Sequence, residues 1–169
     1  MSTRTEGAVG DALLEVRDLR TSFDTMDGTV RAVDGVSFDV RRGRTLGVVG
    51  ESGCGKSVTA LSILRLIERP GRIVGGSVTI GGRDLLAMGD DEIRSVRGDR
   101  ISMIFQEPMT SLNPLHTIER QINEVLILHK RLTREAARRR TLELLEQVGI
   151  PDAAKRLEDR KSTRLNSSH

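Results

Sequence analysis

The sequence predicts an α/β fold, and three observations support this class. In the first half of the chain, apolar residues alternate with polar ones or form short runs, as they do in β-strands. A glycine-rich segment at residues 50–57 separates one of these apolar runs from a helical pattern. From residue 117 onward, apolar residues recur every three or four positions, as they do on one face of a helix. We therefore expect a sheet in the first part of the chain and helices in the last.

The expected strands begin with Leu13–Phe23, whose exit leads into the turn signal Met26–Thr29. The Asp-Gly pair in this turn favours a β-hairpin. The next strand has one buried face, because apolar residues alternate there with Ser37 and Asp39 (Val36, Phe38 and Val40). The run Thr45–Val49 is apolar throughout, which is typical of a buried parallel strand.

Further elements follow the glycine-rich segment. A helix is expected over 58–67, before the Pro70-Gly71 stop, and a strand over Ser77–Ile80. Asp90–Val96 is expected to form a short helix, because Asp90 and Asp91 suit a helix N-terminus. Ile101–Phe105 has the composition of another buried strand.

Two longer helices are expected in the last third of the chain. Thr117 is a suitable N-cap for the first helix, whose apolar face contains Ile118, Ile122, Val125 and Leu126. Thr133 is the N-cap of the second, which runs to Val148 and ends at Gly149. Four arginines in this second helix are compatible with nucleic acid or anionic lipid, but we favour a solvated helix face; they are Arg134, Arg138, Arg139 and Arg140.

The glycine-rich segment fits the phosphate-binding pattern G-x-x-x-x-G-K-[ST]; its residues are Gly50, Glu51, Ser52, Gly53, Cys54, Gly55, Lys56 and Ser57. Glycines let the backbone approach oxygen atoms without a Cβ in the way. The amides and the positive end of the following helix favour phosphates. A lysine suits the β- and γ-phosphates, and a hydroxyl suits Mg²⁺. A turn that binds nothing is the weaker alternative.

Composition excludes several classes of protein. The 169 residues carry a formal net charge of +3, too small for a strong electrostatic field toward acidic partners. Three Phe, no Tyr and no Trp leave little surface for stacking bases, so we expect no nucleic-acid partner. Cys54 is the only cysteine, so no intrachain disulfide forms. No stretch reaches the roughly 20 apolar residues that cross a bilayer, and the three histidines lack metal-ligand spacing.

Three segments resemble one protein family: 33–38 (VDGVSF), 47–57 (GVVGESGCGKS) and 104–114 (IFQEPMTSLNP). The chain resembles the ATP-binding subunits of ABC transporters, specifically the oligopeptide/dipeptide (and nickel) importer group, from Ala12 to about Leu157. The resemblance implies an ABC-type nucleotide-binding domain of the P-loop NTPase class. An N-terminal antiparallel β subdomain and the start of a helical subdomain belong to this fold. The third segment is the most specific of the three.

The resemblance also implies roles for single residues. ATP and Mg²⁺ are the expected cofactors, held by the residues 50–57. Gln106 is similar to the glutamine that reaches Mg²⁺ and the attacking water, so Ser57 and Gln106 are the candidate metal ligands. Phe23 occupies the place of the aromatic residue that stacks on adenine, although a core Phe at the end of the first strand is a serious alternative. Residues 107–116 resemble the segment that faces the membrane subunits.

The chain departs from the family after Leu157. The family continues into a Leu-Ser-Gly-Gly signature, a strand ending in Asp-Glu and a switch histidine, and none of these is present. We therefore expect four regions: a disordered N-terminus (1–11), the β subdomain with the P-loop core (12–106), a partial helical subdomain (107–157) and an out-of-family, artefactual tail (158–169). The chain as given is expected to be incomplete and to hydrolyse ATP poorly, since the catalytic carboxylate is missing.

The expected function is that of the ATPase component of a bacterial peptide importer, peripheral on the cytoplasmic face of the inner membrane. The implied partners are two transmembrane permease subunits, a second ATPase domain and an extracytoplasmic solute-binding protein. Two alternatives remain: a truncated, non-catalytic nucleotide-binding module, and a non-transport ABC protein. The sequence does not distinguish dipeptide, oligopeptide, nickel and glutathione as the solute.

Overall fold

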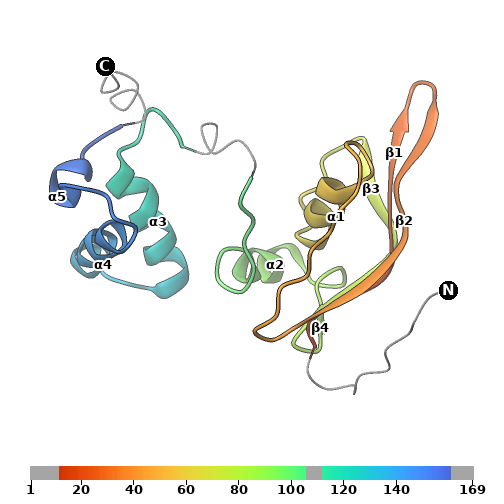
Figure 1. Cartoon of the computed structure of the whole chain (residues 1–169), viewed down its shortest axis with the longest axis horizontal. Coiled ribbons are helices and arrows are strands. Elements are labelled where there is room, and N and C mark those ends of the chain that lie inside the picture. Colours follow the sequence, from red (N-terminus) through yellow and green to blue (C-terminus); the bar gives the residue numbers. More distant parts are fainter. Residues whose placement is uncertain (1–11, 106–111, 161–169) are drawn as a thin grey trace. The chain divides into compact units, whose positions relative to one another are not determined.

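A computed structural model describes residues 12–105 and 112–160. The chain divides into two compact units, Met1–Arg97 and Gly98–His169, and each is described by itself. The first contains the sheet and helices α1 (Lys56–Ile63) and α2 (Asp90–Val96); the second contains α3 (Ile118–Lys130), α4 (Arg134–Gln147) and α5 (Ala153–Arg156) (Figure 1).

The sheet has four antiparallel strands in the order β2-β1-β3-β4. Strands β1 (Ala12–Thr25) and β2 (Gly28–Arg41) form the expected hairpin, in which Thr25 pairs with Gly28. Strand β3 (Gly71–Ile80) includes the expected strand at 77–80 and pairs with the other edge of β1, and β4 (Arg83–Asp84) extends it. In β2 the expected alternation holds, with Phe38 and Val40 half-buried and Ser37 and Asp39 exposed.

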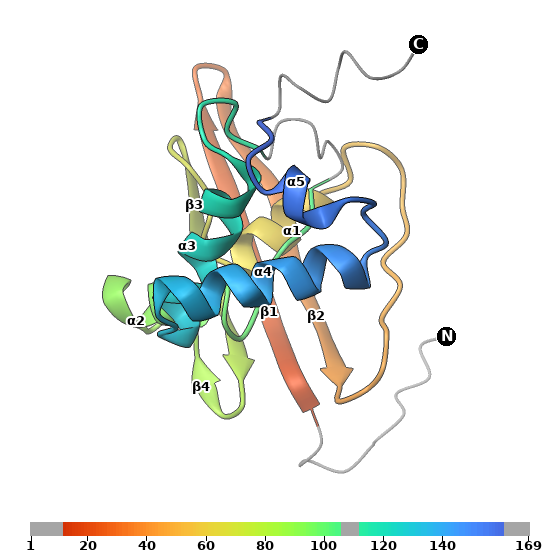
Figure 2. The ribbon, with the colours of Figure 1, turned by 90° about the vertical axis from the view of Figure 1, so that its left-hand side faces the viewer.

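The core of the first unit lies on one face of this sheet. Val16, Leu19 and Val78 are fully buried, and Ile63 and Leu64 of the α1 segment are nearly so. The Thr21 and Ser62 hydroxyls, also fully buried, lie 2.7 Å apart and join β1 to α1. Figure 2 shows α1 against the strands of this unit. Helix α1 is therefore attached to the sheet at its second and last turn.

Two predicted strands are wrong. Thr45–Val49 and Ile101–Phe105 are not part of the sheet, and large apolar side chains of both runs face solvent: Val48 is 58% exposed, Val49 93% and Ile104 94%. A buried parallel strand needs neighbouring strands on its edges and layers on its faces, and the described residues provide neither for these two runs. Both runs are rich in apolar residues, but they lie outside the sheet and are exposed.

The predicted helices are confirmed with small changes of boundary. Helix α2 has the expected bounds, and the N-caps of α3 and α4 are Thr117 and Thr133, whose hydroxyls accept hydrogen bonds from the backbone N–H of Arg120 and Ala136. Helix α1 is shorter than expected, because it ends at Ile63 and the chain turns at Arg65. In the second unit, the core is formed by Leu145, Ala153 and Leu157, with Ile118 and Ile122 of α3 packed against it.

Candidate phosphate-binding site

The candidate site lies where the extended segment after β2 meets the N-terminus of α1. The helix begins at Lys56, directly after Gly55, which has a left-handed backbone (φ 88°). Gly53 is left-handed too (φ 83°). A Cβ at Gly55 would collide with the backbone oxygen of Ala32 in β2, so this position requires glycine. Two glycines of the motif thus shape the loop as the sequence predicts.

The loop is open to solvent, since residues 50–54 and Ser57 are exposed while Gly55 and Lys56 are half-buried. The Lys56 ammonium donates to the backbone oxygens of Gly50 and Glu51 at 2.7 Å each and lies 3.5 Å from Cys54 Sγ. The loop therefore folds around its own lysine. An incoming anion would replace these neutral carbonyl acceptors with negatively charged oxygens, which attract the ammonium more strongly.

The first turn of α1 is suited to an anion. It contains no acidic residue and no side-chain cap at its N-terminus, so its first N–H groups carry the positive end of the helix dipole without competition from a carboxylate. An anion at this end is favoured by about 0.3–1 kcal/mol per charge when exposed, and by more when partly buried. A phosphate group fits this set of donors.

A Mg²⁺ ion is compatible with the residues present. Ser57 is exposed in the first turn of α1 beside Lys56, and its hydroxyl oxygen is a hard ligand of the kind that Mg²⁺ prefers. Mg²⁺ usually keeps several waters and binds through one or two protein ligands plus substrate phosphates. Among the described residues, no group of three or more His, Cys, Asp or Glu side chains is arranged to hold a metal. The metal would therefore depend on the nucleotide.

The other predicted contacts with the nucleotide and its metal are those of Gln106 and Phe23. Gln106 lies outside the described residues, as does the 107–111 part of the segment expected to face membrane subunits. Phe23 is half-buried near the end of β1, and its ring lies close to Gly71. A Cβ added to Gly71 would lie 2.5 Å from the Phe23 ring and 2.6 Å from the Ile67 side chain. This packing fits a core residue, and it leaves the role in binding the base as a prediction.

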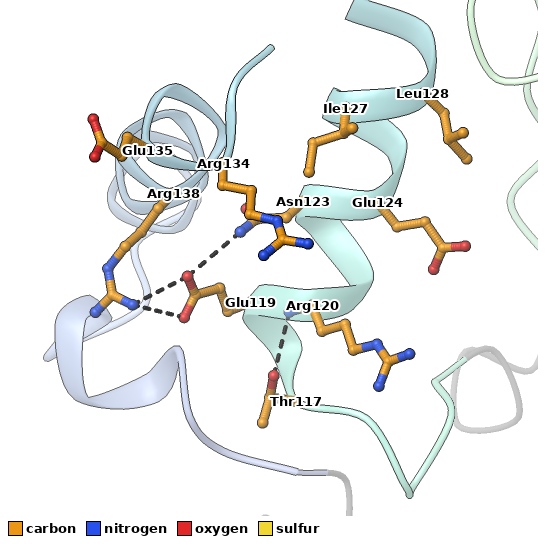
Figure 3. Close-up of a pocket in the computed structure, with 10 residues that line it drawn as sticks. All are labelled: Thr117, Glu119, Arg120, Asn123, Glu124, Ile127, Leu128, Arg134, Glu135 and Arg138. Carbon is orange, nitrogen blue, oxygen red and sulfur yellow. Dashed lines mark hydrogen bonds and ion pairs between the residues drawn. The ribbon is translucent and has the colours of Figure 1, made fainter. Parts of the chain in front are cut away.

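A separate groove of about 670 Å³ lies in the second unit, between α3 and α4 (Figure 3). Charges of both signs line it, and Arg138 holds Glu119 through two contacts of 3.0 and 3.1 Å. Arg140 likewise pairs with Glu143 at 2.7 Å. Two of the four arginines in α4 are therefore paired with carboxylates, as in a solvated helix face. The groove contains none of the predicted site residues.

Sequence reasoning missed two arginines near the other end of α1. Arg65 and Arg97 donate hydrogen bonds to five acceptors within the first unit, three of them at 2.7 Å or less. No motif marks these residues, because their partners are almost all backbone oxygens. The only signal in the sequence was a helical pattern that lacked a glycine at its C-terminal end.

Comparison with known proteins gives a consistent result. The sequence pattern described as "ABC transporter" matches residues 33–167. The probable peptide ABC transporter ATP-binding protein y4tR of Sinorhizobium fredii is 53% identical over 148 residues, which are 87% of this chain and 44% of that protein. The oligopeptide transport ATP-binding protein OppD of Bacillus subtilis is 50% identical over 146 residues, which cover 86% and 41% of the two chains.

The structure is similar to a bacterial ABC transporter cassette, MJ0796, solved as a dimer. The TM-score is 0.75 at 24% identity, and the match covers 91% of this chain and 63% of that one. A likeness at this identity shows the fold. The P-loop at the start of α1, the antiparallel β part and the helical part define an ABC-type nucleotide-binding domain. The chain belongs to the ABC transporter family, and it spans less than half the length of the two curated relatives just described.

No helix in the described part of the chain has the length and apolar character needed to cross a bilayer.

Proposed function

We propose that this chain is the ATP-binding part of a bacterial importer for di- or oligopeptides. The observation that carries the proposal is the loop 50–57 at the uncapped N-terminus of α1, with Lys56 held inside it. Family membership supports ATP as the ligand. The names of relatives at about half identity support peptides as the transported class.

Each predicted residue takes one part in this proposal. The backbone amides of Gly53–Ser57 and the Lys56 ammonium bind the β- and γ-phosphates, while Ser57 and Gln106 hold Mg²⁺. When bound there, the Mg²⁺ ion would supply positive charge that offsets the negative charge of the phosphates. Phe23 is half-buried, and the exposed part of its ring stacks on the base. Lys56 would leave the carbonyl oxygens of Gly50 and Glu51 when it takes up a phosphate.

The activity of the whole protein is also part of the proposal. Two such domains would close on two MgATP and drive two membrane-spanning permease subunits, and hydrolysis would reset them. An extracytoplasmic solute-binding protein would deliver the peptide. The ATP-binding subunit would lie on the cytoplasmic face of the bacterial inner membrane, held there by the permeases.

Binding and turnover of ATP should be measured side by side on the purified chain. Isothermal titration calorimetry with MgATP gives the Kd, and phosphate release gives the rate. Binding without turnover would identify these residues as a non-catalytic nucleotide-binding module. Binding with turnover would make the chain an ATPase by itself. No binding up to millimolar MgATP, with the chain folded by circular dichroism, would contradict the proposal.

The transport role needs a test in the bacterium that carries the gene. Uptake of a labelled dipeptide, a labelled tetrapeptide and Ni²⁺ should be compared between the wild type, a deletion strain and a strain restored with Lys56→Ala. We expect the deletion to abolish uptake of a peptide and the Lys56→Ala gene to leave it abolished. Unchanged uptake of all three solutes would instead favour a non-transport ABC protein.

A further inference from the structure

The C-terminal end of α1 is closed in an unusual way. Helix α1 ends at Ile63, and Arg65 adopts a left-handed backbone (φ 53°) where a glycine is usual. The Arg65 N–H donates to Ser62 O at 3.0 Å, and the Leu66 N–H donates to Leu61 O at 2.8 Å. This is the double hydrogen bond of a Schellman motif. A left-handed backbone is unfavourable for a residue other than glycine, and contacts of the Arg65 side chain offset this cost.

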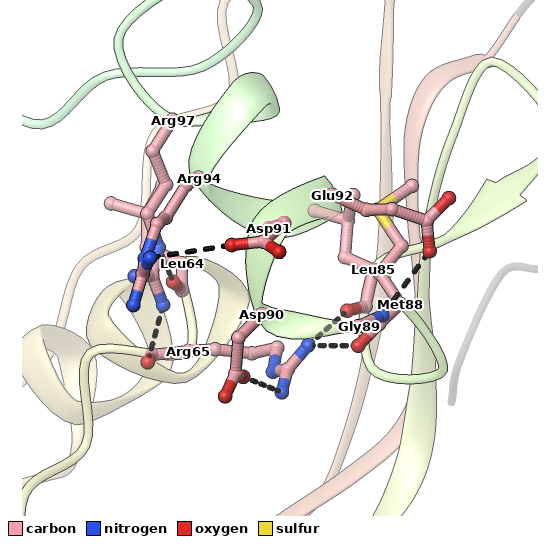
Figure 4. Close-up of polar contacts among 10 residues, drawn as sticks. All are labelled: Leu64, Arg65, Leu85, Met88, Gly89, Asp90, Asp91, Glu92, Arg94 and Arg97. Atoms are coloured by element: carbon pink, nitrogen blue, oxygen red, sulfur yellow. Dashed lines mark hydrogen bonds and ion pairs between the residues drawn. The ribbon is translucent and has the colours of Figure 1, made fainter.

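Those contacts join the end of α1 to the segment before α2. The Arg65 guanidinium donates to Met88 O at 2.5 Å and Leu85 O at 3.3 Å, and it lies 3.5 Å from Asp90 of α2 (Figure 4). Leu85 is fully buried and Met88 is 8% exposed, so the acceptors belong to the core of the unit. Arg65 is therefore fixed at both its backbone and its side chain.

The Arg97 side chain donates hydrogen bonds to the same end of α1. Its Nε donates to Leu64 O and its Nη2 to Arg65 O, both at 2.7 Å. These two carbonyls follow the last helical residue, where no intrahelical donor remains. Burial, and then the neighbouring Arg65 guanidinium, lower the pKa of Arg97 from its ordinary value. A guanidinium that is held beside another cation needs strong acceptors, and the negative end of a helix dipole provides them.

Helix α1 is thus anchored at two places in the first unit. Ser62, in its second and last turn, is bonded to Thr21 of β1, and the carbonyls of Leu64 and Arg65 just after the helix accept hydrogen bonds from Arg97 at the end of α2. The phosphate loop is at the opposite end of the same helix, about 12 Å away at 1.5 Å per residue. Because Ser62 is next to the last helical residue, a small rotation about this contact would move the phosphate loop at the far end the most.

We propose that Arg97 is a positioning residue for nucleotide binding: it fixes the C-terminal end of α1 and thereby holds the amides and Lys56 at the other end in the geometry that a triphosphate requires. This inference rests on the proposed function, since it concerns the same ligand. The groups that contact a ligand must be held within about 0.5 Å by supporting hydrogen bonds and packing. The Arg97 contacts add to the Ser62 hydrogen bond in fixing the orientation of α1.

The test compares three variants of the purified chain. Arg97→Gln removes the cation and cannot reproduce both hydrogen bonds, whereas Arg97→Lys keeps the charge near the helix end. Arg94→Gln is the matched control, since Arg94 lies in α2 and its ion pair is with Asp91 of the same helix. MgATP affinity is measured by calorimetry at a temperature well below the melting transition of every variant. We expect about tenfold weaker binding for Arg97→Gln, a smaller loss for Arg97→Lys and no change for Arg94→Gln.

A second readout does not depend on ATP. Cys54 is the only cysteine and is exposed in the loop, so its rate of alkylation by iodoacetamide reports the loop geometry without nucleotide. We expect this rate to change at least twofold in Arg97→Gln and to stay at the wild-type value in Arg94→Gln. Affinity and alkylation rate unchanged in Arg97→Gln would overturn the inference.

The outcomes remain distinct if a variant or the ligand fails. If Arg97→Gln does not fold, Arg97→Lys decides: weaker MgATP binding at an unchanged melting temperature supports positioning, and unchanged affinity overturns it. If the wild-type chain binds no MgATP, the proposed function fails. An altered alkylation rate in Arg97→Gln would then still show that the helix end controls the loop.

Discussion

The antiparallel sheet and the segment that follows β2, residues 44–57, contrast sharply within one unit. The sheet buries Val16, Leu19 and Val78 completely, while every residue from 42 to 54 is exposed. Both regions are rich in apolar residues, so composition alone does not separate them. Each strand of the sheet is hydrogen-bonded to at least one neighbouring strand. The apolar run 45–49, in contrast, pairs with no strand among the described residues.

Because the sheet is packed and the loop is exposed, we expect the sheet to determine stability and the loop to determine nucleotide binding. Side chains of the sheet are packed, so changes there should alter the free energy of unfolding and leave the loop chemistry intact. Residues of the loop have few packing partners, so changes there should alter nucleotide binding with little effect on unfolding. Unfolding and nucleotide binding, measured on the same variants, test whether the two regions differ in this way.

The largest effect is expected for Lys56→Ala. Charge-assisted hydrogen bonds to two phosphates are worth roughly 1.5–3 kcal/mol each, so MgATP binding should weaken by about a thousandfold. Calorimetry checks this, with Lys155→Ala in α5 as the control. The urea midpoint should stay the same, since the Lys56 ammonium makes its hydrogen bonds to loop oxygens and the Cys54 thiol. A large drop in stability would show that the loop supports the fold.

Gly76→Ala should be the most destabilising single change in the sheet. Gly76 is left-handed (φ 93°), and a Cβ there would lie 2.5–2.6 Å from the backbone of residues 17–19 in β1. We expect a loss of about 3 kcal/mol in the free energy of unfolding by urea. Gly82→Ala is the control: it is also left-handed (φ 79°), but no atom lies within 4 Å of the added Cβ, so about 1 kcal/mol is expected. Equal losses would contradict the proposed collision.

Val16→Ala and Val49→Ala compare the same substitution in the two regions. Val16 is fully buried and Val49 is 93% exposed. Removal of two buried methyl groups lowers the free energy of unfolding by about 2 kcal/mol, including the cost of the cavity. The same change at an exposed site alters it by less than about 0.5 kcal/mol. Urea unfolding of both variants measures the difference. A similar loss for Val49→Ala would mean that the 45–49 run is packed in solution.

Loss of a helix cap should have a smaller effect. Thr117 and Thr133 each accept a hydrogen bond from a backbone N–H at 3.3 Å, so Thr117→Ala and Thr133→Ala should each cost about 1 kcal/mol. Thr→Ser at the same positions keeps the hydroxyl and should lower the stability by only about 0.3 kcal/mol. Thermal melting followed by circular dichroism of the helices measures both. Serine variants as unstable as the alanine variants would rule out capping as the cause.

The smallest effect concerns pH. The hydrogen bond from Lys130 holds the pKa of Asp99 below its ordinary value, so the carboxylate favours the folded state. This contribution is present above the unfolded pKa of about 3.9 and is lost as the pH falls through the lower folded pKa. Asp99→Asn should therefore flatten the acid side of the stability curve below about pH 4. An unchanged curve would mean that solvent screens the exposed pair completely.

Sequence patterns predicted local structure well. The hairpin at Asp27-Gly28, the caps at Thr117 and Thr133 and the left-handed loop glycines all depend on interactions within a few residues. The fold class and the family also followed from residues that are close in sequence.

The two wrong strands and the missed arginines have one cause. Whether the run 45–49 becomes a strand depends on distant neighbours, which periodicity does not record. The Arg97 contact with Leu64 O spans 33 residues and uses a backbone acceptor, so no residue type marks it in the sequence. Long-range partners therefore limit what the sequence alone can predict.

The most direct test of the account is an NMR titration of the ¹⁵N-labelled chain with MgATP. The account predicts that the largest amide shifts occur at Gly53, Gly55, Lys56 and Ser57, whose N–H groups lie in the loop and the first turn of α1. Lys56→Ala should abolish these shifts. The groove between α3 and α4 should be unaffected. Largest shifts around Glu119 and Arg138, with the loop amides unmoved, would contradict the phosphate site.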